Sequence, residues 1–139
     1  MSEETCLFCK ICKGEIKSQV LIDEKDTISI LDLNPCTPGH TLVIPKIHVS
    51  NLLELDNLTS ANLWESVKKN TELLLKSLDP QGFTTGINHG KVSGQSILHL
   101  HVHIIPRYLN DGGGSMHSIV NYKRDPIEDV YKKIKNNIN

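Results

Sequence analysis

The sequence predicts a single α+β domain, with an antiparallel sheet of about five strands, one long helix on a face of the sheet and a C-terminal helix. Three observations support this. The chain has 139 residues, enough for one domain with its own core. Several short stretches alternate polar and apolar residues between glycine and proline turns, which is typical of strands. Two stretches instead repeat apolar residues at helical spacing.

Four stretches are predicted strands, in addition to a histidine-rich one described below. They cover residues 20–23, 27–33, 40–45 and 83–88. Asp32 ends the apolar row of the second stretch, where a carboxylate would stand at the rim of the sheet. A Pro-Gly turn precedes the third stretch, and His40 follows that turn. We interpret His40 as structural rather than as a direct ligand.

The long helix is predicted over residues 60–78, with Thr59 as its N-cap. Its expected buried stripe consists of Trp64, Val67, Thr71, Leu74, Leu75 and Leu78. A second amphipathic helix is predicted over residues 125–138, with Asp125 as its cap. Its stripe consists of Ile127, Val130, Tyr131 and Ile134. Residues 1–5 and the glycine-rich residues 110–120 are expected to be flexible.

The most informative stretch covers residues 97–107, ILHLHVHIIPR. His99, His101 and His103 fall on every second residue, which predicts a strand with three imidazoles on one face. The opposite face is expected to join the core through Leu98, Leu100, Val102 and Ile104. His99 and His103 would lie about 13 Å apart along a strand. This distance makes one ion bound by all three histidines awkward, although a neighbouring pair could share an ion, so the three are expected to have at least two roles.

Cysteines gather at the N-terminus as Cys6-x-x-Cys9 and Cys9-x-x-Cys12. A redox pair is one interpretation, but no strand–helix context of the thioredoxin type follows. A zinc site is the other interpretation and needs two more ligands, which His48 and His99 can supply. Cys12 and Cys36 are most simply free thiols.

Three sequence segments resemble one known family, and one of them contains the histidine triad. The triad His-φ-His-φ-His-φ-φ is complete at residues 99–105, where φ is an apolar residue. NHGKVSGQSILHLHVHIIPRY, LDLNPCTPGHTLVIPKIH and CLFCKI match further segments of the same family in the same order. On these motifs the chain resembles the histidine-triad (HIT) nucleotide hydrolases, and within them the zinc-containing phosphoramidase branch.

The resemblance implies a role for each matching residue. His101 would be the nucleophile, His103 would stabilise charge on the phosphate, and Ser96 would assist the leaving group. Nucleotide contacts are implied for Asp32 (ribose), Asn88 and Gln95 (phosphate), and Phe8, Ile11 and Leu33 (base). A structural zinc is implied on Cys6, Cys9, His48 and His99. A homodimer formed through a strand edge and the long helix is implied as well.

The expected substrate is AMP joined to a small amine, cleaved through a nucleotidyl-histidine intermediate. Dinucleoside polyphosphate hydrolysis is the alternative, but its leaving group needs a cationic groove. Lys91 is the only Lys or Arg between Gly82 and Pro106. A non-catalytic nucleotide- or zinc-binding module is a third interpretation. A histidine at position 103, where the transferase branch has glutamine, favours hydrolysis over transfer.

Charge and hydropathy limit the partners. The net charge is −1, with acids and bases mixed along the chain, so no nucleic-acid footprint is indicated. No apolar run approaches the length of a membrane span, and the acidic MSEETC start is unlike a secretory signal. The cytoplasm is the expected compartment, where thiols stay reduced.

Overall fold

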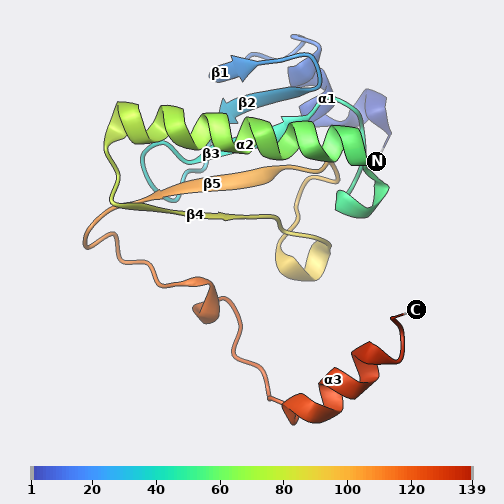
Figure 1. The fold of residues 1–139 in the computed structure, drawn as a ribbon. Coiled ribbons are helices and arrows are strands. Elements are labelled where there is room, and N and C mark those ends of the chain that lie inside the picture. The colour runs from blue at the N-terminus through green and yellow to red at the C-terminus, as the bar shows by residue number, and fades with distance from the viewer. Residues whose placement is uncertain (1, 139) are drawn as a thin grey trace.

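The computed structural model describes residues 2–138 and contains one five-stranded antiparallel sheet in the order β1-β2-β3-β5-β4 (Figure 1). The strands are β1 (Val20–Asp23), β2 (Thr27–Leu31), β3 (Thr41–Pro45), β4 (Gly82–Gly86) and β5 (Val102–Arg107). The predicted α+β fold is confirmed. Strand β2 ends two residues earlier than predicted, β3 begins one residue later, and β4 begins one residue earlier and ends two residues earlier.

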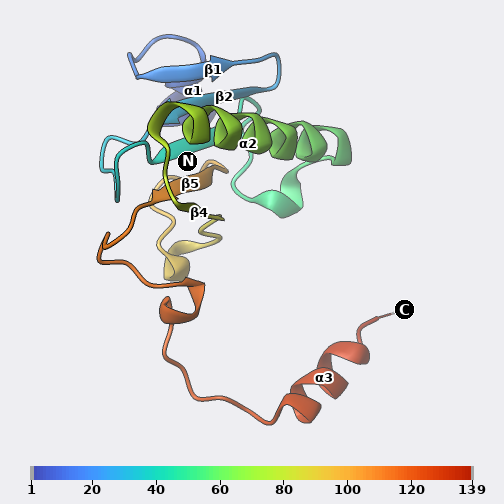
Figure 2. The same ribbon diagram turned by 60° about the vertical axis from the view of Figure 1, so that its left-hand side comes forward.

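Three α-helices accompany the sheet: α1 (Leu7–Cys12), α2 (Asn57–Leu78) and α3 (Ile127–Lys135). The long α2 lies along one face of the sheet, as Figures 1 and 2 show together. The hydrophobic core between α2 and the sheet includes Val43, Val102 and Ile104. The other face packs Ile30 and Leu42 against Phe8 of α1. Helix α1 was not predicted, although a Cys-x-x-Cys spacing is about one helical turn.

Helix α2 begins earlier than predicted, because its N-cap is Asp56 and not Thr59. The Asp56 carboxylate accepts hydrogen bonds from the Thr59 backbone N–H at 2.9 Å and from its hydroxyl at 2.7 Å. A free donor at the start of the helix is thereby satisfied. Thr59 lies within the first turn and supports the cap rather than forming it.

The buried stripe of α2 is also rotated from the prediction. Its buried residues are Leu63, Ser66, Val67, Asn70 and Leu74. Trp64, Leu75 and Leu78 were predicted in the core but are 43, 50 and 42% exposed. The stripe was predicted wrongly because two of its buried residues, Ser66 and Asn70, are polar. The amide of Asn70 donates to the Ser66 carbonyl at 2.8 Å, which allows both residues to be buried within the helix.

The histidine stretch is only partly a strand, because β5 begins at Val102 and leaves residues 97–101 outside the ladder. Pro45 at the end of β3 has no N–H to donate, and its carbonyl accepts from His99 Nε2 instead. The Leu100 N–H donates to the Val49 carbonyl at 2.7 Å. Leu100, Val102 and Ile104 are buried as predicted, but Leu98 is 41% exposed.

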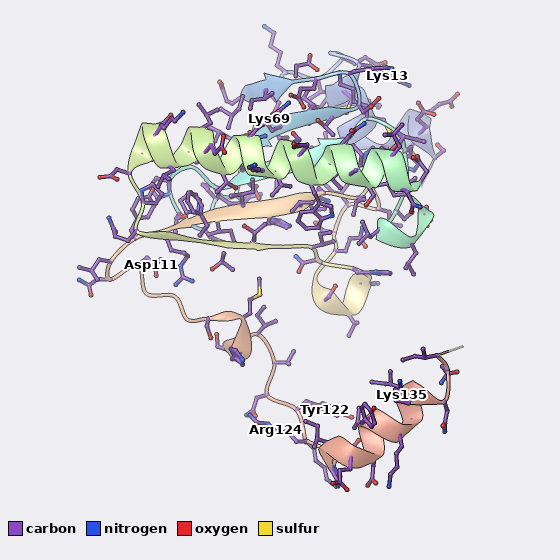
Figure 3. The ribbon with its side chains drawn as sticks, viewed as in Figure 1. Lys13, Lys69, Asp111, Tyr122, Arg124 and Lys135 are labelled. Carbon is purple, nitrogen blue, oxygen red and sulfur yellow. The ribbon has the colours of Figure 1, made fainter. Side chains whose placement is uncertain are left out.

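The C-terminal helix α3 stands away from the sheet at the end of an extended segment (Figures 1 and 3). It is shorter than predicted, and Pro126 takes the N-cap position that was assigned to Asp125. All of α3 is exposed, including its stripe of Ile127, Val130, Tyr131 and Ile134. Among residues 2–138, no helix is long and apolar enough to cross a membrane.

Candidate active site

A cavity of about 290 Å³ lies on the α1 face of the sheet, between α1, the end of β2 and the histidine stretch. Seven of the predicted functional residues line it: Phe8, Ile11, Asp32, Leu33, Ser96, His101 and His103. One part of the lining is apolar, with Leu7, Phe8, Ile11 and Ile30, and suits a flat ring. The polar part of the lining contains Lys17 and Asn34 as well as hydroxyl, carboxylate and imidazole groups. The structure therefore brings most of the implied site into one hollow.

His101 is held in one tautomer by its own chain. Its Nδ1 lies 2.7 Å from the His99 carbonyl oxygen, which can only accept a hydrogen bond. Nδ1 must therefore carry the proton, and Nε2 keeps its lone pair. Phe8 packs against the ring at 73°, with 5.0 Å between ring centroids. Burial lowers the pKa of His101, which favours the neutral, nucleophilic form near pH 7.

His103 is set in the opposite tautomer by a short relay that starts at the backbone. The Cys36 N–H donates to His40 Nδ1 at 3.0 Å, so the His40 proton is on Nε2. His40 Nε2 lies 2.9 Å from His103 Nδ1 and donates to it. The remaining nitrogen of neutral His103, Nε2, is therefore an N–H donor. The two triad histidines therefore have complementary tautomers, with a lone pair on Nε2 of His101 and a proton on Nε2 of His103.

The donor that the relay creates has nothing to bind. Nε2 of His103 is buried and has no hydrogen-bond partner among the described residues. Burial and the neighbouring His101 and His40 lower the pKa of His103 to about 4, so the ring stays neutral at physiological pH. An unsatisfied buried N–H is costly. A phosphate oxygen placed beside His101 would satisfy it.

His40 lies behind the site, and its connection to His103 and Asp32 was not part of the sequence interpretation. It is 4% exposed, and its Nε2 also lies 3.5 Å from the Asp32 carboxylate. Asp32 is fixed by the Asn34 N–H at 2.9 Å and lines the cavity, as predicted for a ribose ligand. The sequence did contain a signal for His40. His40 follows the turn that connects the strand ending near Asp32 to the next strand, so the two side chains are expected at the same rim of the sheet.

The two predicted phosphate contacts do not line the cavity. The side chain of Gln95 is buried and fully engaged. It accepts from the Gly90 N–H at 2.9 Å and donates to the carbonyls of Ser50 and Ile97 at 2.8 and 3.2 Å. Asn88 is half-buried behind Gly94. In this structure, Gln95 holds the loop that precedes the triad.

The four predicted zinc ligands come together beside this cavity. Cys6, Cys9, His48 and His99 each offer one ligand atom, and these atoms lie within 4.8 Å of one another. The Sγ–Nδ1 distances are 3.3 Å for Cys6–His99 and for Cys9–His48, and Nδ1 of His48 is 3.2 Å from Nδ1 of His99. Ligand atoms around a tetrahedral zinc with such bonds are about 3.5 Å apart. The residues therefore fit the metal.

The surroundings of the cluster suit a cation as well. His99 donates from Nε2 to the Pro45 carbonyl at 2.7 Å, which leaves Nδ1 to face the other three groups. Without a metal, burial and the neighbouring Cys6 raise the pKa of Cys9 to about 12. A bound zinc ion would instead hold both thiols as thiolates. Cys12 and Cys36 are free thiols, as predicted.

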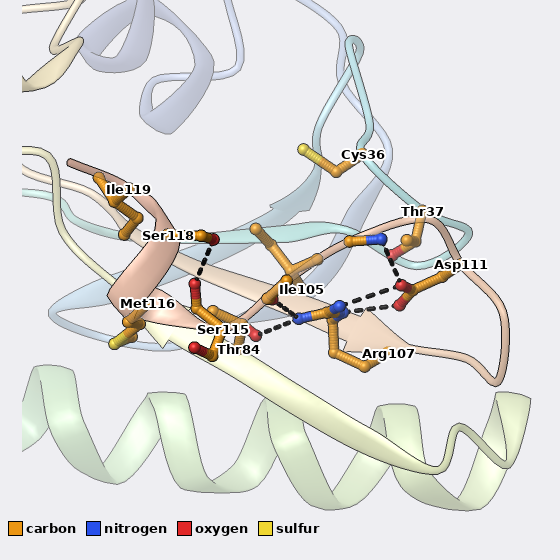
Figure 4. Close-up of a pocket in the computed structure, with 12 residues that line it drawn as sticks. Cys36, Thr37, Thr84, Ile105, Arg107, Asp111, Ser115, Met116, Ser118 and Ile119 are labelled. Atoms are coloured by element: carbon orange, nitrogen blue, oxygen red, sulfur yellow. Dashed lines mark hydrogen bonds and ion pairs between the residues drawn. The ribbon is translucent and has the colours of Figure 1, made fainter. Parts of the chain in front are cut away.

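A second cavity of about 290 Å³ is lined by Thr84 of β4, by Ile105 and Arg107 of β5, and by residues of the segment after β5 (Figure 4). Its one cation, Arg107, is fully used. The guanidinium binds both oxygens of Asp111, the Thr84 hydroxyl and the Gly114 carbonyl. The pairing also lowers the pKa of Asp111. The cavity lining also contains the free thiol of Cys36, but no histidine or unpaired carboxylate.

The fold and the triad site together define a protein of the histidine-dependent, nucleotide-processing class. A family model described as the HIT domain matches residues 13–110. The chain belongs to the HIT family.

Curated relatives agree with this assignment. The chain is 39% identical over 130 residues to a HIT-like protein of Methanocaldococcus jannaschii, covering 94% of this chain and 98% of that one. It is 37% identical over 103 residues, 74% of each chain, to the adenosine 5′-monophosphoramidase of Schizosaccharomyces pombe. It is 36% identical to an adenylylsulfatase of Arabidopsis thaliana, over 78% of this chain and 55% of that one.

Solved structures show the same fold. A HIT-family protein of Bacillus subtilis superposes with a TM-score of 0.84 at 33% identity, covering 97% of this chain and 98% of that one. A zinc-bound histidine triad family protein of Mycobacterium smegmatis superposes with a TM-score of 0.75 at 28% identity, covering 95 and 91%.

Proposed function

We propose that this protein hydrolyses nucleotide conjugates of the adenosine 5′-phosphoramidate type, releasing AMP and an amine. The observation that carries the proposal is the complementary pair of tautomers. His101 keeps a free lone pair on Nε2, while the neighbouring His103 presents a buried and unsatisfied Nε2–H. A phosphorus centre needs both groups, one to attack and one to stabilise the oxygen on which charge develops.

The first step forms a covalent intermediate. Nε2 of His101 attacks the α-phosphorus, and a bond from this nitrogen to phosphorus forms as the bond to the leaving nitrogen breaks. The leaving nitrogen takes the bonding electrons and a proton, which the Ser96 hydroxyl relays from water. His103 donates to a non-bridging oxygen throughout. Asp32 and the apolar lining hold the ribose and the base.

The second step restores the enzyme. Water attacks the phosphorus, the bond from phosphorus to His101 Nε2 breaks, and AMP forms. The imidazole is a workable leaving group because the His99 carbonyl still accepts from Nδ1 and stabilises positive charge on the ring. The sum of the two steps is one water consumed and one P–N bond cleaved.

A structural zinc belongs to the same proposal. Cys6, Cys9, His48 and His99 would hold it, and the ion would join the N-terminal segment to the histidine stretch. The relative described as zinc-bound supports this assignment. The ion would take no part in the reaction itself, because all four ligand positions belong to the protein.

The decisive experiment compares wild-type protein with His101→Ala on adenosine 5′-phosphoramidate. We expect wild-type turnover to AMP and ammonia, and a loss of at least about 10³-fold in the variant. AMP affinity should change little, because the base and ribose contacts remain. His117→Ala, at an exposed histidine that does not line the nucleotide cavity, is the matched control. A large loss of AMP affinity with only a modest loss of rate would contradict the role of His101.

Dinucleoside polyphosphate hydrolysis is the alternative within the enzyme class. Comparing kcat/KM for adenosine 5′-phosphoramidate and diadenosine tetraphosphate on one preparation separates the two. A polyphosphate leaving group would need several cations, and Lys91 is the only one in residues 82–106. A faster dinucleotide would reject the phosphoramidase assignment and leave His101 in place. No turnover of either substrate would favour a non-catalytic binding module.

A homodimer is the assembly that we propose. Strand β4 is at the edge of the sheet, next to β5 alone. On α2, Lys69 pairs with Glu24 and Asn62 with Asp26, so that flank faces the β1–β2 end of the sheet. Trp64, Leu75 and Leu78 fall on the opposite flank by helical geometry and are exposed there. The free edge and the apolar flank together suit pairing with a second copy.

A further inference from the structure

We propose that Cys12 is an oxidation site beside the metal cluster, where a peroxide converts Cys12 and Cys9 into a disulfide and so withdraws one ligand from the cluster. The co-reactant is a small two-electron oxidant of the hydrogen peroxide class. The inference rests on the proposed zinc site and is independent of the proposed hydrolysis.

Helix α1 and its N-cap carry one thiol more than the zinc site needs. Cys6, Cys9 and Cys12 follow one another at intervals of three residues, and the first two belong to the metal cluster. Cys12 is the last residue of α1 and packs against the hydrophobic cluster that contains the other two. The third thiol is therefore held beside the site without being one of its ligands.

Cys12 is also the most accessible of these three thiols. Cys6 is 0% and Cys9 2% exposed, whereas Cys12 is half-buried. A small, uncharged oxidant therefore reaches Cys12 more easily than either ligand. Burial raises the pKa of the Cys12 thiol, which keeps the thiol mainly protonated and slow to react, so the site responds to an excess of oxidant.

The backbone of α1 places Cys9 and Cys12 at the separation that a disulfide requires. The turn between them is regular, because the Lys13 N–H donates to the Cys9 carbonyl at 3.0 Å. Residues three apart in an α-helix have Cα atoms about 5 Å apart. Disulfides span Cα separations of roughly 4.4–6.8 Å. The pair can therefore be bridged while the backbone of α1 stays in place.

The oxidation consumes one peroxide and yields two waters. The Cys12 sulfur attacks one peroxide oxygen, the O–O bond breaks, and a sulfenic acid and the first water form. The Cys9 sulfur then attacks the Cys12 sulfur, the S–O bond breaks, and the departing hydroxide takes up a proton to become the second water. Both thiols are oxidised and the peroxide is reduced. A thiol reductant reverses the bridge.

The disulfide removes a ligand from the middle of the cluster. Sγ of Cys9 lies 3.3 Å from Nδ1 of His48 and 3.4 Å from Nδ1 of His99. The thiolate is the form of cysteine that binds metal, and a disulfide sulfur carries no such charge. The remaining three ligands would hold zinc less tightly, so oxidation should release the ion.

The test treats the full chain, loaded with a stoichiometric amount of zinc, with an excess of hydrogen peroxide. A chromophoric chelator follows the released zinc, and trypsin maps the disulfide. Cleavage after Lys10 and Lys13 leaves Cys6 and Cys9 on one peptide and Cys12 on the next. We expect zinc release together with a disulfide between these two peptides, which fragmentation assigns to Cys9. Dithiothreitol with added zinc should reverse both changes.

Matched variants isolate the role of Cys12. Cys12→Ser should slow the release of zinc by at least about fivefold, because no accessible thiol then remains beside the cluster. Cys12→Ala should behave in the same way and shows whether the serine hydroxyl disturbs the packing of α1. Cys36→Ala, at an exposed thiol outside α1, should release zinc at the wild-type rate. All three variants should bind zinc before oxidation, because neither residue is a ligand.

Zinc release at the wild-type rate in both Cys12 variants, or a disulfide that does not join Cys9 to Cys12, would overturn the role of Cys12. Zinc that stays bound to the wild type under excess oxidant would overturn it as well. A wild type that binds no zinc would overturn the zinc site and this inference together. Turnover of adenosine 5′-phosphoramidate, measured separately, decides the proposed function.

Discussion

At the scale of single residues, the direction of each imidazole proton decides what the site can do. His101 receives its orientation from the carbonyl of His99, and His103 receives the opposite one through His40. Both orientations start at backbone groups, which can only accept or only donate. Backbone groups of two separate segments, the His99 carbonyl and the Cys36 N–H, therefore give two chemically identical side chains opposite tautomers.

His40 should act as a positioning residue. We expect His40→Asn to lower kcat by up to about a hundredfold, because His103 would no longer be held as a donor toward the phosphate. The AMP dissociation constant should change little, since His40 does not line the nucleotide cavity. Turnover and AMP titration on one preparation check this, with His117→Asn as control. A parallel loss of AMP affinity and thermal stability would indicate a purely structural role.

Residue identities were more predictable from the sequence than residue contacts. The motif placed Phe8, Asp32 and Ser96 correctly around one cavity. It could not show that the Gln95 amide is consumed by the backbone of its own loop, nor that His40 lies behind His103. Those facts depend on register and on turn geometry, which a pattern of residue types does not contain.

At the scale of elements, local chemistry explains where the prediction of α2 was wrong. A carboxylate and a hydroxyl three residues apart can both cap a helix, and the structure uses the carboxylate of Asp56. Asp56→Ala should lower the free energy of unfolding by about 1 kcal/mol. Thr59→Ala should cost about half of that or less, because the backbone bond to Asp56 remains. Urea denaturation of both variants checks the order, and the reverse order would restore Thr59 as the cap.

A strand was predictable where alternation and burial agreed, as in the second half of the histidine stretch. Prediction failed where proline or buried polar residues intervened. Pro45 ends the ladder before His99, and Ser66 with Asn70 hides the buried face of α2. The resemblance supplied the zinc ligands, although no short-range pattern connects residues so far apart in the chain.

The four Cys and His residues that could hold a metal come from three separate segments, and the loss of the proposed ion should be measurable. We expect about one zinc per chain in protein purified without chelators. Cys6→Ala should reduce the zinc content and lower Tm, because the remaining buried ligands lose their shared cation. Cys36→Ala, at an exposed thiol, is the control. Absence of zinc in the wild-type protein, together with an unchanged Tm in Cys6→Ala, would contradict the proposed zinc site.

At the scale of the whole molecule, apolar surface remains exposed on α2 and α3. Light scattering at micromolar concentration should give the mass of two chains. Leu75→Glu should shift the protein toward monomer by placing a charge on the apolar flank of α2, while Lys76→Glu, on a different side of the same turn, should not. A wild type that scatters as a monomer would contradict the dimer.

One residue joins two functions in this molecule. The ring of His99 belongs to the metal cluster, and its carbonyl orients the ring of His101. Loss of the proposed ion would therefore affect the orientation of His101 through the backbone of His99. The ion would not have to contact the substrate for this effect. Two purifications of the same protein could differ in specific activity solely through exposure to a chelator. Metal content should be measured alongside every rate before any candidate substrate is discarded as inactive.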